Sequence, residues 1–303
     1  MSISKFIKRN LSSIQRSNRK KQVLRTVASS DQNNYGITNV YRMDSNNVGD
    51  YYCAPHLYFN DLNCNPVDIY DYKSNDKSVA NKWVESINNN ALIIGGGGLL
   101  NRGSFEKQLK LFESLKSKGK KTVLWGTGHN EKDKSRFGKV RSYNINVNNF
   151  GLVGVRDFGF TKKWVPCVSC MHKVFDKEYL VSQEIGLLYH KKTLKNKSLI
   201  KKLSQYPSSS NTTNLEEMID FIGKSETIVT DSYHCMYWSM ILGKKVIVIP
   251  NSSKFYDFKY KPVFATFSDF DTKLKMTQCY SGVLEECREQ NKEFAKRVMD
   301  YLN

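Results

Sequence analysis

One histidine, His234, stands where an ionisable side chain could do chemistry, in the stretch TDSYHCMYWSMILGKKVIVIP (Thr230 to Pro250). The stretch reads as a strand, a helix and a second strand, with His234 in the first turn of the helix. Imidazole titrates near neutral pH and suits a general acid or base, although a structural role is the alternative. Because a helix N-terminus disfavours imidazolium unless an anion lies nearby, a bound anion would tune the protonation of His234.

Two further polar side chains follow predicted strands in the first half of the chain. WGTGHN places His129 just after an apolar run, and GVRD does the same for Arg156. Ligands of open parallel sheets bind beyond the carboxyl ends of the strands, so both side chains are candidates for a site. The Arg156 guanidinium can hold a phosphate or carboxylate through two parallel hydrogen bonds, or it can simply pair with Asp157 beside it.

Two glycine-containing turns also follow strands, NNVGD and GGGG. A glycine lets the backbone approach a ligand, and the N–H groups of a glycine run can cradle an anion. GGGG lacks the spacing of a dinucleotide or phosphate loop, so each turn by itself fits a tight bend without a ligand equally well. The candidate contacts in these turns are Asn47, Gly49, Asp50, Gly96, Gly97 and Gly98.

The cysteines give no metal signature. Cys167, Cys170 and His172 are three potential zinc ligands, but no second CxxC or histidine pair accompanies them, so pocket lining is favoured and no metal is predicted. Seven scattered cysteines fit a reducing compartment better than a disulfide framework. No apolar stretch approaches the roughly 18 residues that span a bilayer, and the N-terminus lacks a signal-peptide core. We therefore expect a cytoplasmic protein.

Apolar runs alternate with helical patterns along most of the chain, which predicts crossovers and mostly parallel sheets. Strands are expected within 36–43, 91–100, 120–130, 150–157, 184–192, 226–232 and 244–250. Helices are expected within 47–62, 105–119, 214–225, 233–243 and 284–303, and a basic helix precedes a loop at 206–214. Gly119 should end the helix before it, and Asn214 with Glu217 forms a capping-box-like pair.

The alternation of strands and helices is interrupted near residue 175 and then resumes, which predicts an α/β protein of two facing Rossmann-like domains. We place a basic arm at 1–34, the N-terminal domain at 35–175, and the C-terminal domain with its final helix at 176–303.

The formal net charge of +18 concerns partners rather than fold. Much of the excess lies in Lys191 to Lys202 and in the arm, at Lys5, Lys8, Arg9, Arg16, Arg19, Lys20, Lys21 and Arg25. In the arm, Ile3, Phe6, Ile7, Leu11 and Ile14 recur at roughly helical spacing. This pattern fits peripheral contact with an anionic membrane surface, or a disordered tail. No zinc finger, basic zipper or RNA-binding signature is present, so no specific nucleic-acid partner is expected.

Taken in order, NVGDYY, IIGGGGLLN, WGTGHN, GVRD and the segment from Leu215 to Pro250 resemble the polysaccharide pyruvyl transferase family. The resemblance runs from about Tyr41 to Pro250. It implies a glycosyltransferase-B-like arrangement with the active site in the inter-domain cleft. It also implies transfer of the enolpyruvyl group of phosphoenolpyruvate to a cell-surface glycan sugar, as a cyclic ketal with release of phosphate. Phosphoenolpyruvate would be the donor substrate, with no separate cofactor. The acceptor would be nucleotide-linked, lipid-linked or polymeric.

The resemblance also implies roles for single residues. His234 matches the histidine of the family's Ser-Arg-x-His segment and would be the general acid. Arg156 would bind the anionic donor, and His129 is a looser match to a donor-binding position. Ser232 stands where the family usually has arginine. Lys254 or Lys259, in the loop after the last strand, could supply the missing cation; a different donor or acceptor is the alternative.

Two other functions fit parts of the pattern. A glycosyltransferase of the same architecture would be expected to carry an E-x7-E pair late in the second domain, and NSSKFYDFKYKPVF after Pro250 has none. A non-catalytic binder of polyanions or membranes would explain the charge. It would give no reason for His234, Arg156 and the glycine turns to follow strand ends.

Overall fold

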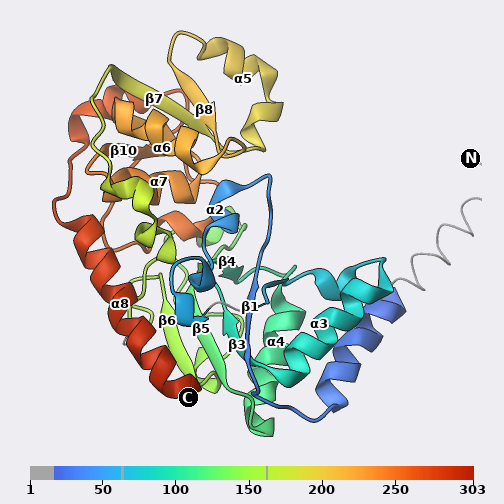
Figure 1. Ribbon diagram of the computed structural model, residues 1–303. Helices are drawn as coiled ribbons and strands as arrows, with labels where there is room; N and C mark the ends of the chain where they lie inside the picture. Colours follow the sequence, from blue (N-terminus) through green and yellow to red (C-terminus); the bar gives the residue numbers. More distant parts are fainter. Residues whose placement is uncertain (1–16, 63–64, 162) are drawn as a thin grey trace, which may run out of the picture.

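The computed structural model describes residues 17–62, 65–161 and 163–303, which form two parallel β-sheets with flanking helices (Figure 1). The first sheet contains β1 (Ile37–Tyr41), β2 (Val67–Asp68), β3 (Ala91–Ile94), β4 (Gly97–Leu100), β5 (Thr122–His129) and β6 (Leu152–Val155). β3 and β4 pair in succession with one edge of β5, and β6 pairs with the other edge. β1 lies between β2 and β3.

The second sheet contains β7 (Gln183–Tyr189), β8 (Ser208–Ser210), β9 (Ser225–Thr230), β10 (Lys245–Val248) and β11 (Val263–Phe264). Its order is β11-β10-β9-β7-β8, and all its pairings are parallel. Two all-parallel sheets, each built from strands connected by crossovers, confirm the predicted α/β class with two Rossmann-like domains.

The α-helices with complete bounds are α2 (Val48–Tyr51), α3 (Lys77–Asn89), α4 (Glu106–Leu115), α5 (Lys197–Lys202), α6 (Leu215–Lys224), α7 (Tyr233–Ile241) and α8 (Val283–Leu302). The chain after α4 ends its last turn at Gly119, whose φ of 79° lies in the left-handed region that glycine tolerates, as predicted. The Asn214 side chain accepts a hydrogen bond from the Glu217 N–H and caps α6. The Glu217 carboxylate bonds the Thr213 hydroxyl instead of completing a capping box.

Three local predictions were wrong in part. β3 ends at Ile94, before the glycine run, as predicted, but a new strand, β4, begins beside β5 at Gly97, after Gly95 and Gly96 donate to other main-chain carbonyls. The expected loop 206–214 contains β8, a three-residue serine strand with no apolar pattern to reveal it. Only a four-residue helix, α2, forms within 47–62, where short 3₁₀ turns follow it.

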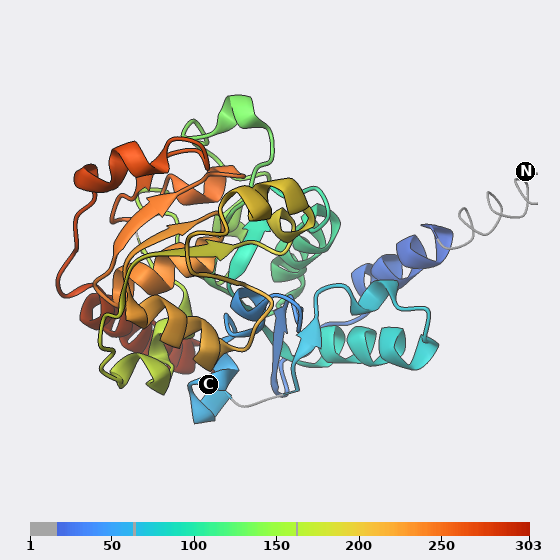
Figure 2. The same cartoon turned by 90° about the horizontal axis from the view of Figure 1, so that it is seen from above.

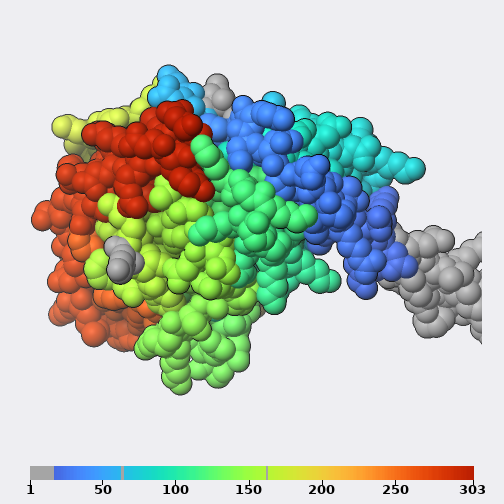
Figure 3. Space-filling view, turned by 90° about the horizontal axis from the view of Figure 1, so that it is seen from below, coloured from blue at the N-terminus to red at the C-terminus, as the bar shows by residue number. Residues whose placement is uncertain are grey.

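The C-terminal helix α8 returns to the first sheet, beside β6 (Figures 1 and 3). Phe294, Ala295 and Val298 share an apolar cluster with Trp125 of β5. The Trp125 indole N–H donates to Asn291 Oδ1 at 2.8 Å, so one buried polar pair ties α8 to the sheet. The domain limits themselves stay a prediction.

Residues 17–29 form a helix that lies with α3 at the side of the first sheet (Figure 2). Arg19 in this helix donates to the Ser74 carbonyl and the Asn75 side chain. The rest of the predicted basic arm, residues 1–16, lies outside the described residues. No helix in the described ranges is long and apolar enough to cross a membrane.

Candidate active site

A cleft of about 410 Å³ lies between the carboxyl ends of the two sheets. Its walls come from the segments after β1, β5 and β6 on one side, and from those after β7, β9 and β10 on the other. Eight of the eleven predicted site residues line it: Asn47, Asp50, Gly97, Gly98, Arg156, Ser232, His234 and Lys254. Parallel strands bring these residues together because their carboxyl ends share one edge of each sheet.

Arg156 is a buried cation that forms no ion pair within the described residues, although its charge acts on Asp50 and Asp157. Its side chain follows β6, is 1% exposed, and stacks 3.8 Å from the ring centre of Tyr233 in the other domain. None of its three guanidinium nitrogens has a hydrogen-bond partner among the described residues. A Cβ at position 128 would lie 2.6 Å from Arg156 Nε, so Gly128 leaves the room that the side chain needs. Burying an unpaired charge is costly, and a bound anion removes that cost.

His234 lies in the first turn of α7 and is 6% exposed. Its Nε2 is 3.6 Å from Cys167 Sγ, and its ring centre is 5.5 Å from that of Trp238. On the opposite side the ring packs against α2, where a Cβ at Gly49 would come within 2.1 Å of Nδ1. Burial, and then the charges of Arg156 and Lys254, lower the pKa of His234 well below its usual value. The imidazole is therefore neutral in the free protein.

Lys254 is the second cation at this end of the cleft, in the turn Ser253–Phe255 after β10. Burial lowers its pKa to about 7, and the neighbouring charges of Lys132 and Arg156 act in the same direction. No carboxylate within the described residues pairs with it. Lys259, the other candidate to replace the family arginine, is bonded to Glu286 and does not line the cleft.

Polar side chains connect the two domains across the cleft. Asp50 Oδ2 accepts a hydrogen bond of 2.6 Å from Asn47 Nδ2, and Asn47 Oδ1 accepts one of 3.0 Å from Asn211 Nδ2. Lys191 of the second domain pairs with Asp44 of the first at 2.6 Å. Burial raises the pKa of Asp50, while Lys254 and Arg156 oppose that rise. The contacts of Asn211 with Asn47 and of Lys191 with Asp44 fix the two walls of the cleft relative to each other. The buried Asp50 carboxylate lies near the charges of Lys254 and Arg156.

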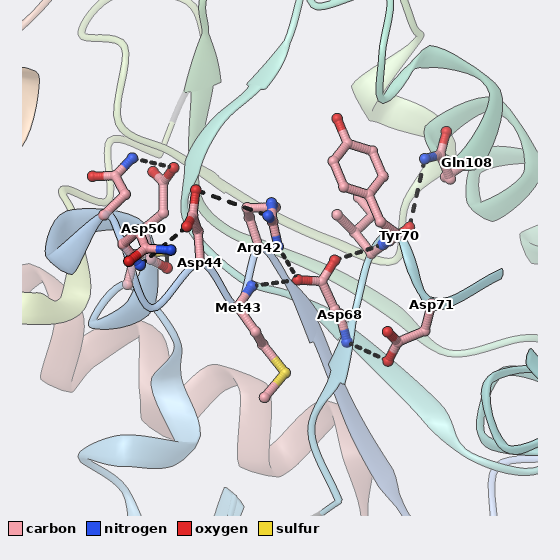
Figure 4. A network of polar contacts seen from close by, with 12 residues as sticks. Arg42, Met43, Asp44, Asp50, Asp68, Tyr70, Asp71 and Gln108 are labelled. Carbon is pink, nitrogen blue, oxygen red and sulfur yellow. Dashed lines mark hydrogen bonds and ion pairs between the residues drawn. The ribbon is translucent and has the colours of Figure 1, made fainter. Parts of the chain in front are cut away.

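Figure 4 shows how the rim near β1 is neutralised. The Arg42 guanidinium bonds the Asp68 carboxylate and lies 3.8 Å from Asp44 Oδ2. Asp68 also accepts hydrogen bonds from the main-chain N–H groups of Met43, at 2.8 Å, and Tyr70, at 2.7 Å. Arg42 lines the cleft, but its charge is already paired.

The family model for polysaccharide pyruvyl transferase matches residues 30–253. The chain belongs to the polysaccharide pyruvyl transferase family. A comparison with curated proteins gives no match. Among solved structures, one similar chain is an uncharacterised protein of Klebsiella pneumoniae, with 18% identity and a TM-score of 0.44. The match covers 76% of this chain and 93% of that one.

Three predicted residues of this pyruvyl transferase family member do not line the cleft. Both ring nitrogens of His129 are occupied, Nδ1 by Ser253 Oγ at 2.6 Å and Nε2 by Asp257 Oδ2 at 2.8 Å. His129 thus fastens β5 to the second domain. The Gly96 N–H donates to the Cys53 carbonyl and is not free for an anion, and Gly49 lies behind His234.

The three potential zinc ligands, Cys167, Cys170 and His172, each have a different hydrogen-bond partner. Cys170 Sγ accepts from Asn291 at 3.5 Å, and His172 Nδ1 accepts from the Val174 N–H at 3.1 Å. Across the described ranges, no group of three or more His, Cys, Asp and Glu is placed to hold a metal ion. Cys167 instead packs against His234.

Sequence reasoning missed several cleft residues: Arg102, Asn130, Lys132, His190, Lys192 and Tyr233. Asn130 and His190 directly follow strands β5 and β7, so the rule that selected Arg156 could also have selected them. Nothing in the sequence marks Tyr233 as the ring beneath Arg156, because that contact joins two domains.

Proposed function

We propose that this protein transfers the enolpyruvyl group of phosphoenolpyruvate to two hydroxyls of a sugar, which forms a pyruvate ketal and releases phosphate. The observation that carries the proposal is the buried Arg156 guanidinium, whose three nitrogens lack partners in the described residues and which lines the same cleft as His234 and Lys254. Phosphoenolpyruvate has a phosphate and a carboxylate beside a carbon–carbon double bond. A guanidinium fork fits either anionic group, and a lysine supplies a second charge.

Donor binding would also prepare the proton donor. Burial first, and then the charges of Arg156 and Lys254, lower the pKa of His234, and a bound anion offsets the part that comes from both charges. The pKa of His234 therefore rises when the donor binds, and the imidazole can carry a proton. Ser232 in place of arginine leaves one cation fewer at the start of α7, and Lys254 takes that role from the neighbouring turn after β10.

The chemistry then proceeds in two steps, an addition to the double bond and a substitution of phosphate. His234 gives its proton to the methylene carbon, which becomes a methyl group, and the positive charge that develops at C2 is attacked by a sugar hydroxyl. The second hydroxyl attacks the same carbon and displaces phosphate, which closes the ketal. Each hydroxyl releases one proton. Asp50, a cleft carboxylate whose pKa is raised by burial, is the base that we assign to the first of these protons, and phosphate takes the second.

We place the acceptor in a cell-surface polysaccharide or its precursor, assembled in the cytoplasm at the inner face of the membrane. The basic arm would provide peripheral contact with anionic lipid. This part of the proposal rests on family membership and on the charge of the chain.

Isothermal titration calorimetry with phosphoenolpyruvate, phosphate, UDP and a UDP-sugar tests the donor. Hydrogen bonds to charged groups contribute about 1.5–3 kcal/mol, so Arg156→Ala should weaken phosphoenolpyruvate binding about 10- to 150-fold. Arg141→Ala is the matched control, because Arg141 is exposed and its guanidinium bonds only nearby main-chain carbonyls. Binding of a UDP-sugar but not of phosphoenolpyruvate would instead indicate a glycosyltransferase. Equal affinity in both variants would make Arg156 structural.

A further inference from the structure

We propose that the mouth of the cleft is a second anion site, which binds the diphosphate of an activated sugar acceptor while the donor occupies Arg156 and Lys254. The site, here called the outer basic site, consists of Arg102 and Lys132 from the first domain and His190 and Lys192 from the second. The inference rests on the proposed function and adds the chemical class of its acceptor.

The outer basic site carries charge that the protein itself does not neutralise. Seven lysine and arginine side chains line the cleft against three aspartates. Arg42 and Lys191 are the basic residues paired with carboxylates. The side chains of Arg102 and Lys192 have no hydrogen bond or ion pair within the described part of the chain, and Lys132 Nζ donates only to the Asn251 carbonyl, at 3.3 Å.

The nearby acidic group, Asp231, forms no ion pair with these cations within the described residues, although its charge raises the pKa of Lys132 and of Lys254. Asp231 lines the cleft, but its Oδ1 accepts a hydrogen bond of 2.6 Å from the His190 N–H, and its Oδ2 accepts one of 2.5 Å from Thr193 Oγ1. The carboxylate therefore orders the loop after β7 and does not pair with Lys132 or Lys192. Like charges left together in this way repel one another, and an anion that binds between them relieves the repulsion.

His190 adds a neutral donor to the site. Its Nδ1 accepts a hydrogen bond of 3.2 Å from the Lys192 N–H, which places the ring proton on Nε2. Burial lowers the pKa of His190 to about 3, and the charges of Lys254, Lys132, Lys191 and Lys192 add to the effect. The neutral His190 ring therefore presents its Nε2–H among cationic side chains, where it can donate a hydrogen bond to an anionic oxygen.

The outer basic site is more exposed than the donor end, because Lys132 and Lys192 are exposed whereas Arg156 and His234 are buried. Lys132, whose pKa is lowered to about 8 first by desolvation, is affected next by Arg102 and Lys192. The charges of Lys132 and Arg156 both lower the pKa of Lys254, so the two groups of cations interact through it.

The position of the site favours a glycosyl diphosphate over a neutral glycan. The ketal must form on sugar hydroxyls near the buried His234, and the exposed lysines of the outer basic site line the same cleft, where they can meet the phosphates of a sugar diphosphate. Asn130 follows β5 in this wall, and its buried Oδ1 has no partner among the described residues. This oxygen can accept a hydrogen bond from a sugar hydroxyl. A nucleotide and a lipid carrier present the same diphosphate, so the site predicts their shared chemistry.

The experiment is calorimetric titration of the full chain with inorganic pyrophosphate, with and without saturating phosphoenolpyruvate. The test variant is Lys132→Ala with Lys192→Ala. The matched control is Lys134→Ala with Lys197→Ala, two exposed lysines that do not line the cleft. Pyrophosphate should bind in the presence of the donor. The test variant should bind it at least about tenfold more weakly without losing affinity for phosphoenolpyruvate, because removing Lys132 takes away a charge that lowers the pKa of Lys254. Arg156→Ala should lose affinity for phosphoenolpyruvate and keep its binding of pyrophosphate.

The outcomes separate this inference from the proposed function. If pyrophosphate displaces phosphoenolpyruvate and depends on Arg156 alone, the cleft has one anion site and the inference is overturned. An equal loss in the test and control variants would also overturn it, because net charge would explain the binding. If pyrophosphate binding depends on Lys132 and Lys192 but phosphoenolpyruvate does not bind, the site stands and the proposed donor is wrong. UDP-glucose and farnesyl diphosphate then distinguish the carriers, since the tighter ligand identifies a nucleotide or a lipid.

Discussion

Replacing Gly49 by alanine should displace His234 and reduce turnover, although residue 49 carries no reactive group. A Cβ at this position would lie 2.1 Å from His234 Nδ1 and 2.3 Å from its Cγ, whereas ordinary contacts begin at 3.4 Å. The His234 imidazole would have to move away from the new Cβ by the difference between 3.4 Å and 2.1 Å, about 1.3 Å. Its retreat is blocked, because Cys167 Sγ lies 3.6 Å from Nε2 and the indole of Trp238 packs against the ring.

The magnitude follows from this geometry. Overpacking a filled interior costs about 1–3 kcal/mol of folding free energy. A misplacement of about 1 Å in a reacting group can cost about 100-fold in rate, so we expect a loss of that order in kcat. The backbone does not add to the effect, because Gly49 is absent from the described residues with positive φ and alanine can adopt its conformation.

The assay is steady-state ketal formation, together with thermal unfolding of the same preparations. Gly103→Ala is the matched control, because a Cβ there would meet nothing within 4 Å and its φ is also not positive. The control should keep wild-type turnover and melting temperature. If Gly49→Ala retains turnover within about threefold and unfolds at the wild-type temperature, the packing of His234 against α2 does not set its catalytic position.

Three further predictions concern single side chains. His234→Ala should lower turnover at least ~100-fold with a smaller effect on donor affinity, and a near-wild-type rate would remove the imidazole from the mechanism. Because the pKa of Lys254 is about 7, the affinity of the wild-type protein for phosphoenolpyruvate should fall as pH rises above 7. The affinity of Lys254→Arg should stay constant up to pH 9, because arginine keeps its charge. Equal dependence of affinity on pH in both proteins would exclude Lys254 as the titrating group. Asn291→Ala leaves the buried Trp125 N–H without its acceptor, which should cost about 1–3 kcal/mol in urea unfolding, and an unchanged midpoint and slope would contradict this reasoning.

The sequence by itself determined the alternation of strands and helices and the positions that could reach a ligand. Apolar runs and helix caps are local signals, so β5, α6 and α7 lie close to where the pattern predicted them. In a parallel sheet each strand ends at the same edge. The motifs around Asn47, Arg156 and His234 could therefore be assigned to one cleft before any distance was known.

Tertiary structure decided which partner each side chain meets. His129 follows a strand just as Arg156 does, but one ring is saturated by Ser253 and Asp257 while the other side chain is left unpaired over Tyr233. β8 has no apolar pattern of its own and exists because β7 offers an open edge. These contacts join residues from different domains or depend on a neighbouring strand. Local sequence specifies which strand end carries a side chain. Only the packing of the two domains decides whether its charge is paired and its hydrogen-bonding groups are occupied.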